Sequence, residues 1–266
     1  MSIIKLLPEN VANQIAAGEV VQRPSSVVKE LLENSIDSGA KSVKLIIKDA
    51  GKTLIQVIDD GCGMNKVDLN KCFLRHATSK IRNSKDLFDL KTMGFRGEAL
   101  SSIAAVSHLT INSNKILDED LGNEIKLEAG EITSKNEILC KKGTSISVRN
   151  LFFNIPARRN FLKSDNVELR HVIDEFHRIA LINHEIDFIF VNNGNELFNL
   201  KKSIFKERII RIFGKSTEQK LVPIREKTDI ASIEGFVYKP EYTKKTRSTQ
   251  FFFVNNRFVK NSHLHH

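Results

Sequence analysis

The sequence predicts an α+β protein with a large first domain and a small second one. Two patterns carry the fold class: β-rich segments that come in pairs around short turns, as in antiparallel hairpins, and amphipathic segments long enough for helices. The length carries the number of domains, because 266 residues exceed the roughly 100–150 residues typical of one domain. We expect the first domain to span residues 1–200, and a small, truncated α/β domain to occupy residues 201–266.

Residues 24–39 are expected to form the best-defined helix. Pro24 suits the first turn, where a missing N–H is tolerated, and Gly39 suits the position after the last turn. Between them, an apolar arc recurs with helical spacing and consists of Val27, Val28, Leu31, Leu32, Ser35 and Ile36. This arc predicts a helix with one buried face.

The other elements alternate between hairpins and helices. A turn at residues 49–52 and the Asn-Gly pair at residues 193–194 predict two hairpins. Strands are expected at residues 42–48, 53–59, 109–113, 124–127, 144–151, 186–192, 196–200, 233–238 and 251–259, the last split by Asn255-Asn256, and further helices at 98–106, 167–181 and 204–213. Residues 65–95 show short helical pieces without sustained periodicity, which indicates a mobile insertion.

Composition and charge exclude several classes of protein. Hydrophobic residues make up 41% and charged residues 27%, so neither a disordered nor a fibrous chain is indicated. No segment approaches the ~20 apolar residues of a membrane span, and the start lacks the core of a signal peptide. The three cysteines form no paired motif, so we expect a reducing cytoplasm. A net charge of +9 favours a polyanionic partner, although it also serves solubility alone.

Three polar residues lie along one edge of the helix expected at 24–39: Glu30, Asn34 and Asp37. At about 100° per residue, Asn34 and Asp37 fall within roughly 40° of Glu30, beside the apolar arc. Asparagine at the border of a buried face needs a partner. A magnesium ion, which takes oxygen ligands, is such a partner, and Glu30 can then act as a general base on a water. The alternative is an ordinary solvated face.

A carboxylate followed by a glycine loop ends the strand expected at residues 53–59. Asp59 precedes Gly61 and Gly63, which allow close approach to the backbone. An ionised carboxylate only accepts hydrogen bonds, so at the edge of a sheet it suits the exocyclic amine of a purine. The alternative is a tight turn after a strand.

A turn bounded by glycines leads into the helix expected at residues 98–106. It consists of Gly94, Phe95, Arg96 and Gly97. Backbone N–H groups at the start of a helix, joined by an arginine, suit the phosphates of a nucleotide. The preceding insertion offers further donors in Thr78, Ser79 and Lys80. A glycine turn is weakly specific by itself, and this one is neither a G-x-x-x-x-G-K-[ST] loop nor a dinucleotide-binding fingerprint.

Taken together, four segments resemble the four motifs of the GHKL ATPases in order and spacing: residues 30–34, 59–64, 94–100 and 143–144. Three others resemble signatures of the MutL family of DNA mismatch repair proteins: residues 13–21, 75–80 and 154–159. The resemblance covers essentially the whole chain and is strongest up to residue 162. It implies a GHKL-type α/β sandwich, with helices on one face of a mixed, mostly antiparallel sheet.

The resemblance also implies roles for individual residues. Glu30 would activate the attacking water, Asn34 would bind Mg²⁺ and Asp59 would contact adenine. A lid near residues 65–100 would order over ATP, and the implied activity is hydrolysis of Mg·ATP. The implied nucleotide-contacting residues are Asn34, Asp37, Asp59, Gly61, Gly63, Met64, Thr78, Ser79, Lys80, Gly94, Phe95, Arg96, Gly97, Glu98, Ala99, Leu100 and Thr144.

The resemblance implies partners as well. In this family ATP binding drives association of two N-terminal regions, and it gates contact with DNA, the mismatch-recognition protein MutS and downstream repair factors. The family also places a phosphate-contacting lysine late in the second domain and a dimerisation domain after it, which bears an endonuclease site in many relatives. This sequence reaches neither, so we expect impaired hydrolysis and no nuclease site in this chain.

The expected second domain carries a basic segment at residues 239–260, with six basic residues and one acid. Alternate residues of a strand share a face, so part of this segment suits a groove that follows the phosphates of DNA. The candidate DNA contacts are Lys244, Lys245, Arg247, Arg257 and Lys260. We expect binding without sequence preference that weakens steeply with salt. The alternative is a solvated hairpin.

Two other functions stay open on the sequence alone. One is an ATP-sensing DNA clamp with negligible turnover, which differs from an ATPase in its rate. The other is the ATPase subunit of a type II topoisomerase, which shares the four GHKL motifs but should lack residues 75–80 and 154–159 in their present form.

Overall fold

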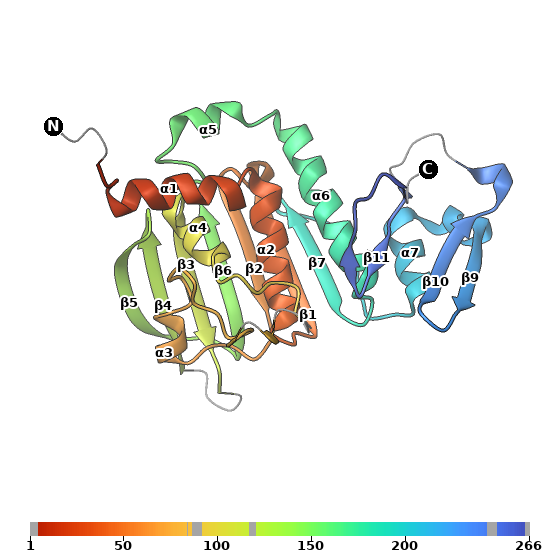
Figure 1. The fold of residues 1–266 in the computed structure, drawn as a ribbon, viewed down its shortest axis with the longest axis horizontal. Helices are drawn as coiled ribbons and strands as arrows, with labels where there is room; N and C mark the ends of the chain where they lie inside the picture. The colour runs from red at the N-terminus through yellow and green to blue at the C-terminus, as the bar shows by residue number, and fades with distance from the viewer. Residues whose placement is uncertain (1–4, 84, 87–91, 117–120, 244–248, 264–266) are drawn as a thin grey trace.

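A computed structural model describes residues 5–83, 85–86, 92–116, 121–243 and 249–263. Its main feature is an eight-stranded sheet in the order β5-β4-β3-β6-β2-β1-β7-β8 (Figure 1). β1 is parallel to β7, and every other neighbouring pair is antiparallel. The strands are β1 Ser42–Lys48, β2 Leu54–Asp59, β3 His108–Asn114, β4 Leu121–Glu128, β5 Glu131–Leu139, β6 Gly143–Arg149, β7 Asp187–Asn192 and β8 Asn195–Leu200. The predicted α+β class, with its mixed and mostly antiparallel sheet, is confirmed.

Helices cover one face of this sheet (Figure 1). They are α1 Glu9–Val20, α2 Pro24–Asp37, α4 Ala99–Ala105 and α6 Asp165–Ile182. The apolar arc of α2 is buried as expected, and Val27, Val28 and Leu32 have no exposed surface. Burial of each such side chain contributes about 1.5–3 kcal/mol. The core therefore fixes the rotation of α2 and leaves its polar edge at the border of the core.

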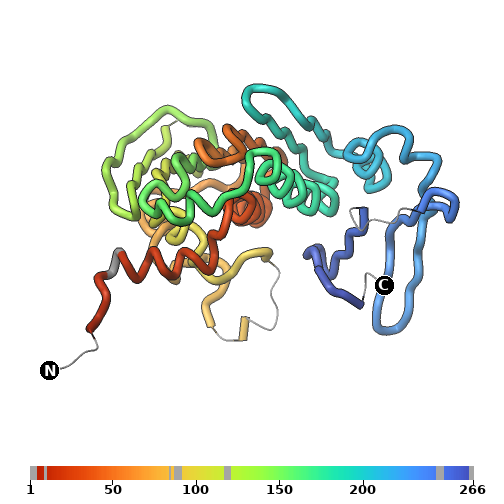
Figure 2. Tube along the Cα trace, turned by 90° about the horizontal axis from the view of Figure 1, so that it is seen from above, coloured from red at the N-terminus to blue at the C-terminus, as the bar shows by residue number. Residues whose placement is uncertain are grey.

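Residues 201–263, which we call the C-terminal segment, follow the last strand of the large sheet. Their main elements are α7 Phe205–Phe213, β9 Leu221–Lys227, β10 Ser232–Tyr238, β11 Phe253–Val254 and β12 Arg257–Phe258. β11 and β12, the darkest blue in Figure 2, lie on the side of this segment that faces the large sheet and its helices. Helix α7 packs on α6, so the C-terminal segment is in contact with the large domain. The predicted domain boundary near residue 200 stays a prediction.

The sequence patterns do not predict four elements: α1, β5, β9 and the short helix α5 Pro156–Phe161. β5 is an edge strand with mostly exposed side chains, so it has no apolar alternation to detect. α5 buries no residue. The remaining short pieces are α3 Lys66–Leu69 and the 3₁₀ turns Asp49–Gly51, Lys215–Lys220 and Pro240–Tyr242. Both predicted hairpins, β1 with β2 and β7 with β8, are confirmed.

Candidate nucleotide site

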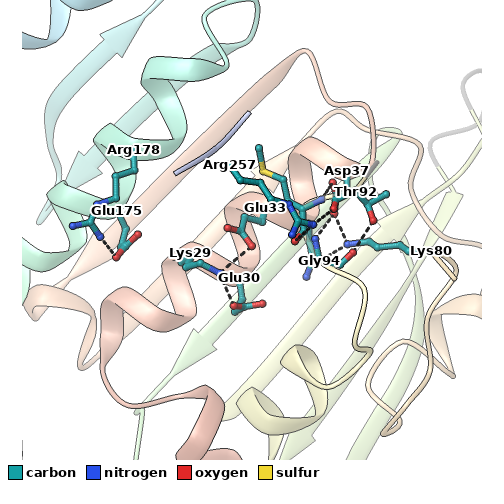
Figure 3. Close-up of polar contacts among 12 residues, drawn as sticks. Lys29, Glu30, Glu33, Asp37, Lys80, Thr92, Gly94, Glu175, Arg178 and Arg257 are labelled. Atoms are coloured by element: carbon teal, nitrogen blue, oxygen red, sulfur yellow. Dashed lines mark hydrogen bonds and ion pairs between the residues drawn. The ribbon is translucent and has the colours of Figure 1, made fainter. Parts of the chain in front are cut away.

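The polar edge of α2 gathers a cation and a loop at its C-terminal end. The Lys80 ammonium donates to Asp37 Oδ2 at 2.6 Å (Figure 3). It also donates to Asn34 Oδ1 at 2.9 Å. Both side chains of this ion pair are largely buried, with 19% of Lys80 and 6% of Asp37 exposed. Two of the three residues expected on this edge therefore converge on one positive charge.

The Asp37 carboxylate also holds the start of the glycine turn. Its Oδ1 accepts the Met93 N–H at 2.8 Å, and its Oδ2 accepts the Gly94 N–H at 3.0 Å. The Thr92 hydroxyl donates to the Gly94 carbonyl at 2.8 Å and closes the turn on itself. Asp37 thus uses its oxygens on protein donors, and through it α2 and the turn become one unit.

Glu30 lies one helical turn before Asn34 and has a different partner. The Lys29 ammonium lies 3.0 Å from Glu30 Oε1 and 3.1 Å from Glu33 Oε2 (Figure 3). Burial opposes the charge on Lys29, but the two carboxylates raise the pKa of Lys29 above its ordinary value. Burial also raises the pKa of Glu33. The expected general base is therefore a quarter exposed and paired with Lys29.

Asp59, at the end of β2, faces two serines of the same helix end. Ser35 Oγ donates to Asp59 Oδ2 at 2.9 Å, the Gly61 amide donates to Oδ1 at 3.0 Å, and Ser38 Oγ lies 3.5 Å away. Burial raises the pKa of the Asp59 carboxyl, while the Ser35 and Gly61 hydrogen bonds oppose that rise. Asp59 is thus a largely buried acceptor fixed beside α2.

The glycines after Asp59 are required by close approach. A Cβ on Gly61 would lie 1.9 Å from Ser38 Oγ, and one on Gly63, whose φ is +63°, would lie 1.9 Å from the Asn114 carbonyl. Met64 N–H donates to Ser113 Oγ at 2.9 Å, and the same hydroxyl lies 3.0 Å from Thr144 Oγ1. In the sheet, Thr144 pairs with Asp59. The loop and Thr144 therefore frame the carboxylate of Asp59.

The glycine turn packs against the segment that carries the hydroxyl donors. A Cβ on Gly97, whose φ is +66°, would lie 2.6 Å from the Ala77 carbonyl oxygen. The Lys80 N–H donates to Thr78 Oγ1 at 3.1 Å, while Ser79 is exposed. The structure thus brings residues 77–80 and 94–97 together, while their contact with phosphates stays a prediction.

The residues after this turn have structural contacts. Arg96 lies over the Phe95 ring, 5.7 Å from its centroid, and the carboxylate of Glu98 lies 3.4 Å from His76 Nδ1. Helix α4 begins at Ala99, and Leu100 packs at the border of the core. The helix expected at residues 98–106 is confirmed. It begins one residue later and ends one residue earlier than expected.

The candidate DNA contacts have different positions. Lys244, Lys245 and Arg247 lie outside the described residues. Lys260 is exposed, whereas Arg257 is partly buried and donates from Nη2 to the Thr92 carbonyl and, at 3.1 Å, to the Met93 carbonyl. The arginine expected on a DNA-binding surface therefore contacts the loop that Asp37 holds.

Sequence reasoning misses four residues of this region, Lys29, Ser35, Ser38 and Met93, and it expects Arg257 at DNA instead of at this loop. Ser35 carries a usable signal, because a serine inside an apolar arc needs a polar partner. Met93 and Arg257 carry none, since one contributes only backbone atoms and the other lies on a distant strand. Helix periodicity cannot detect either contact.

A magnesium ion at this site would depend mainly on Asn34. Across the residues that the structure describes, no three His, Cys, Asp or Glu side chains are arranged to hold a metal ion. Asn34 Oδ1 nevertheless binds the Lys80 ammonium, which shows that this oxygen accepts a cation. One protein oxygen is compatible with magnesium, which usually takes its other ligands from phosphates and waters.

Two surface cavities lie away from this cluster. One, of about 250 Å³, lies between α3 and strands β4 and β5, and the other, of about 340 Å³, is lined by residues of α1, α5 and α6. Neither includes Asn34, Asp37 or Asp59.

Within the described ranges, no helix combines the length and apolar character needed to cross a membrane.

Comparisons with known proteins agree with this geometry. Residues 22–155 match the family described as histidine kinase-, DNA gyrase B-, and HSP90-like ATPase, and residues 209–266 match the C-terminal domain of DNA mismatch repair protein. The chain is 62% identical to the DNA mismatch repair protein MutL of Flavobacterium psychrophilum over 265 residues and 51% identical to that of Parabacteroides distasonis over 263. Each alignment covers at least 99% of this chain but 43% of the relative, so the chain spans less than half of those proteins.

Solved structures show the same relationship. The Aquifex aeolicus MutL ATPase domain complexed with ADP is 33% identical, with a TM-score of 0.73 over 92% of this chain and 86% of that one. The N-terminal domain of a DNA repair protein has a TM-score of 0.81 at 26% identity, over 94% of this chain and 78% of that one. These matches favour MutL over the type II topoisomerase alternative. The chain belongs to the MutL family of DNA mismatch repair proteins and carries the N-terminal GHKL ATPase domain of that family.

Proposed function

We propose that this chain binds Mg·ATP and hydrolyses it at the site formed by α2, the loop after Asp59 and the described residues 77–80 and 92–100. One observation carries the proposal: Asp37 holds the glycine turn at Met93 and Gly94 and also shares the Lys80 ammonium with Asn34. Donors for phosphates and an oxygen for a cation therefore meet at the end of one helix. The Aquifex relative that was solved with ADP supports a nucleotide as the ligand.

The protein residues would divide the work of binding. Asp59 would accept a hydrogen bond from the amine of adenine, because its carboxylate lies at the end of β2 and, when ionised, can only accept. Thr78, Lys80 and the amides at residues 95–97 of the turn would donate to the phosphates, while the Gly94 amide stays on Asp37. The Lys80 ammonium would then move from Asn34 to a phosphate oxygen, which frees Asn34 for a cation.

Asn34 would hold Mg²⁺ together with phosphate oxygens and waters, and the bound ion would offset the negative charge of the phosphates. Glu30 would accept the proton of the attacking water as a general base. Its ion pair with Lys29, whose ammonium lies 3.0 Å from Oε1, makes Glu30 less basic, so release from this pair would favour proton transfer. Lys29 can remain with Glu33, so the release of Glu30 leaves no unpaired cation.

The same pairing favours a second candidate function. If Lys29 keeps Glu30 occupied, the chain would act as an ATP-sensing clamp with negligible turnover, in which nucleotide controls conformation. For either function we propose Mg²⁺ as cofactor, a cytoplasmic location, ATP-driven association of two copies, and contact with DNA, MutS and downstream repair factors. The repair role of the curated relatives and the net charge of +9 support these partners.

Turnover of ATP by matched variants tests the proposal. Glu30→Ala should bind Mg·ATP like the wild type but hydrolyse it about 10²-fold more slowly or worse, the usual loss of a general base. Glu33→Ala is the control, because Glu33 shares Lys29 with Glu30 but has no proposed contact with the water. Equal turnover in wild type and Glu30→Ala contradicts the catalytic role, and binding with negligible wild-type turnover supports the clamp.

A further inference from the structure

A hydrogen-bonded contact joins the C-terminal segment to the candidate nucleotide site. Arg257 lies on β12 and is separated by 164 residues from Met93, to whose carbonyl its Nη2 donates at 3.1 Å. The same nitrogen donates to the Thr92 carbonyl. Figure 3 shows the Arg257 side chain beside Asp37, Thr92 and Gly94.

Arg257 and Asp37 hold the same short stretch of backbone by complementary groups. Asp37 accepts the N–H groups of Met93 and Gly94, at 2.8 and 3.0 Å, while Arg257 donates to the carbonyls of Thr92 and Met93. Met93 is thus bound by a carboxylate through its N–H and by a guanidinium through its C=O. Both bonds are charge-assisted, and such hydrogen bonds are stronger than neutral ones.

The hairpin that carries Arg257 is seated by its neighbours. Val254 pairs with Arg257, and Phe253 with Phe258. The Phe258 ring lies 4.5 Å from the Arg178 guanidinium of α6. Because adjacent strand residues point to opposite sides, Phe258 can rest on α6 while Arg257 reaches the loop at residues 92–93. The contact of Phe258 with α6 therefore helps to set where the Arg257 guanidinium lies.

We propose that Arg257 is a positioning residue of the nucleotide site and couples the C-terminal segment to it. The inference rests on the proposed function, since it takes ATP as the ligand of the turn at 94–97. Arg257 touches the loop and not the reacting atoms. By binding the carbonyls of residues 92 and 93, Arg257 orders the backbone just before the residues that would contact the phosphates. This order lowers the conformational entropy that ATP binding would otherwise cost.

The contact makes the coupling reciprocal. If the loop at 92–94 is better ordered when β12 is seated, bound nucleotide must in turn favour the seated position of β12. Arg257 would then report the state of the nucleotide site to the C-terminal segment. The Arg257 guanidinium, which the sequence places on a DNA-binding surface, thus forms a contact within the chain.

Amide hydrogen exchange and ATP affinity of the same variants test the inference. In the nucleotide-free chain, Arg257→Ala should speed exchange at the Met93 and Gly94 amides about tenfold, and it should weaken binding of a fluorescent ATP analogue with Mg²⁺ about tenfold, as expected on loss of one charge-assisted donor. Arg257→Lys keeps a charged donor and should recover part of both effects. Arg225→Ala, an exposed arginine of β9, should leave both unchanged.

The two readouts separate the two proposals. Unchanged exchange at Met93 and Gly94 in a folded Arg257→Ala variant that binds ATP like the wild type overturns the positioning role. Faster exchange at these amides in a chain whose wild type does not bind ATP keeps the loop contact and contradicts the proposed function. Faster exchange across all of β11, β12 and α7 would instead show that the substitution unseats the hairpin, and would overturn the local role of Arg257.

Discussion

Lys80 Nζ lies 2.6 Å from Asp37 Oδ2 and so joins the segment at residues 77–80 to the end of α2. Both side chains are largely buried, and Asp37 keeps two further hydrogen bonds to the backbone at Met93 and Gly94. The ion pair therefore lies at the centre of a network and not on the open surface, where such pairs contribute little.

A double-mutant cycle should detect this network. We predict that Asp37→Asn and Lys80→Met are coupled by about 1–2 kcal/mol in the free energy of unfolding, because each change leaves a largely buried partner unsatisfied. The ion pair between Lys66 and Glu137 is the control, since both side chains are more than half exposed. Its variants Lys66→Met and Glu137→Gln should couple by less than about 0.5 kcal/mol. Additive effects at both pairs would contradict the network.

The contact between Gly97 and Ala77 predicts a steric effect on nucleotide binding. Gly97→Ala adds a Cβ 2.6 Å from the Ala77 carbonyl at a φ of +66°, so it should separate the two phosphate-binding segments and weaken ATP binding about tenfold or more. Gly194→Ala has a similar φ of +84° but no atom within 4 Å. It should cost about 1 kcal/mol of stability and leave ATP affinity unchanged. Equal ATP affinities for the two variants would argue against contact between the segments.

Arg208 of α7 should be a major source of stability. It has no exposed surface and donates to the carbonyls of Ala180 at 2.6 Å, Ile186 at 2.7 Å and His184 at 3.0 Å. Burial lowers its pKa to about 10. Arg208→Met should lower the free energy of unfolding by about 3 kcal/mol or more, because it leaves several buried carbonyls without a hydrogen-bond donor.

Arg211 provides the matched control on the same helix, because it is exposed and has only weak contacts: a hydrogen bond to the Lys201 carbonyl at 3.2 Å and a surface ion pair with Glu207 at 3.7 Å. Arg211→Met should change stability by no more than about 0.5 kcal/mol in chemical denaturation. A similar small loss in Arg208→Met would show that its carbonyl partners find water.

His177 predicts an acid-sensitive stability. Its ring packs between Phe198 and Phe213, at 5.0 and 5.8 Å between centroids, and its Nε2 has no hydrogen-bond partner among the described residues. Burial lowers its pKa from 6.5 to about 4, although Asp174 opposes the shift. Between these two pH values His177 is protonated in the unfolded chain but not in the folded one. Its contribution to the free energy of unfolding is therefore fully present above pH 6.5 and is lost as the pH falls toward 4.

The loss attributable to His177 should reach about 2–3 kcal/mol. The variant His177→Leu should flatten the dependence of unfolding free energy on pH in this window. Wild type and variant with the same slope between pH 6.5 and pH 4 would assign the acid sensitivity to other groups.

Much of the fold follows from local patterns, and the exceptions have physical causes. The helix at 24–39 and the hairpin of β1 and β2 are predictable because their apolar spacing and their turn chemistry agree. β5 is not, because it has no buried face and is defined only by its hydrogen bonds to β4. α5, which buries no residue, carries no pattern either.

The candidate site divides in the same way. Angular spacing on α2 predicts that Asn34 and Asp37 share an edge, and the structure brings both to Lys80. What spacing cannot give is a contact between distant segments. The bond from Arg257 to Met93 spans 164 residues and uses a backbone oxygen, so no local pattern indicates it. The roles of these residues toward nucleotide stay predictions.

Equilibrium binding of Mg·ATP to Asp59→Asn tests the nucleotide site most directly. Asp59 is the proposed acceptor for adenine. An amide in its place turns one of its two acceptor oxygens into an NH2 donor, and the Ser35 hydroxyl and the Gly61 amide compete for the oxygen that remains. Asp60→Asn is the control, because the neighbouring carboxylate accepts the Lys41 and Ser42 amides at 2.7 and 2.9 Å. We predict that Asp59→Asn remains folded and binds at least about 100-fold more weakly, while Asp60→Asn binds like the wild type. A folded Asp59→Asn variant that retains wild-type affinity for ATP would contradict the site.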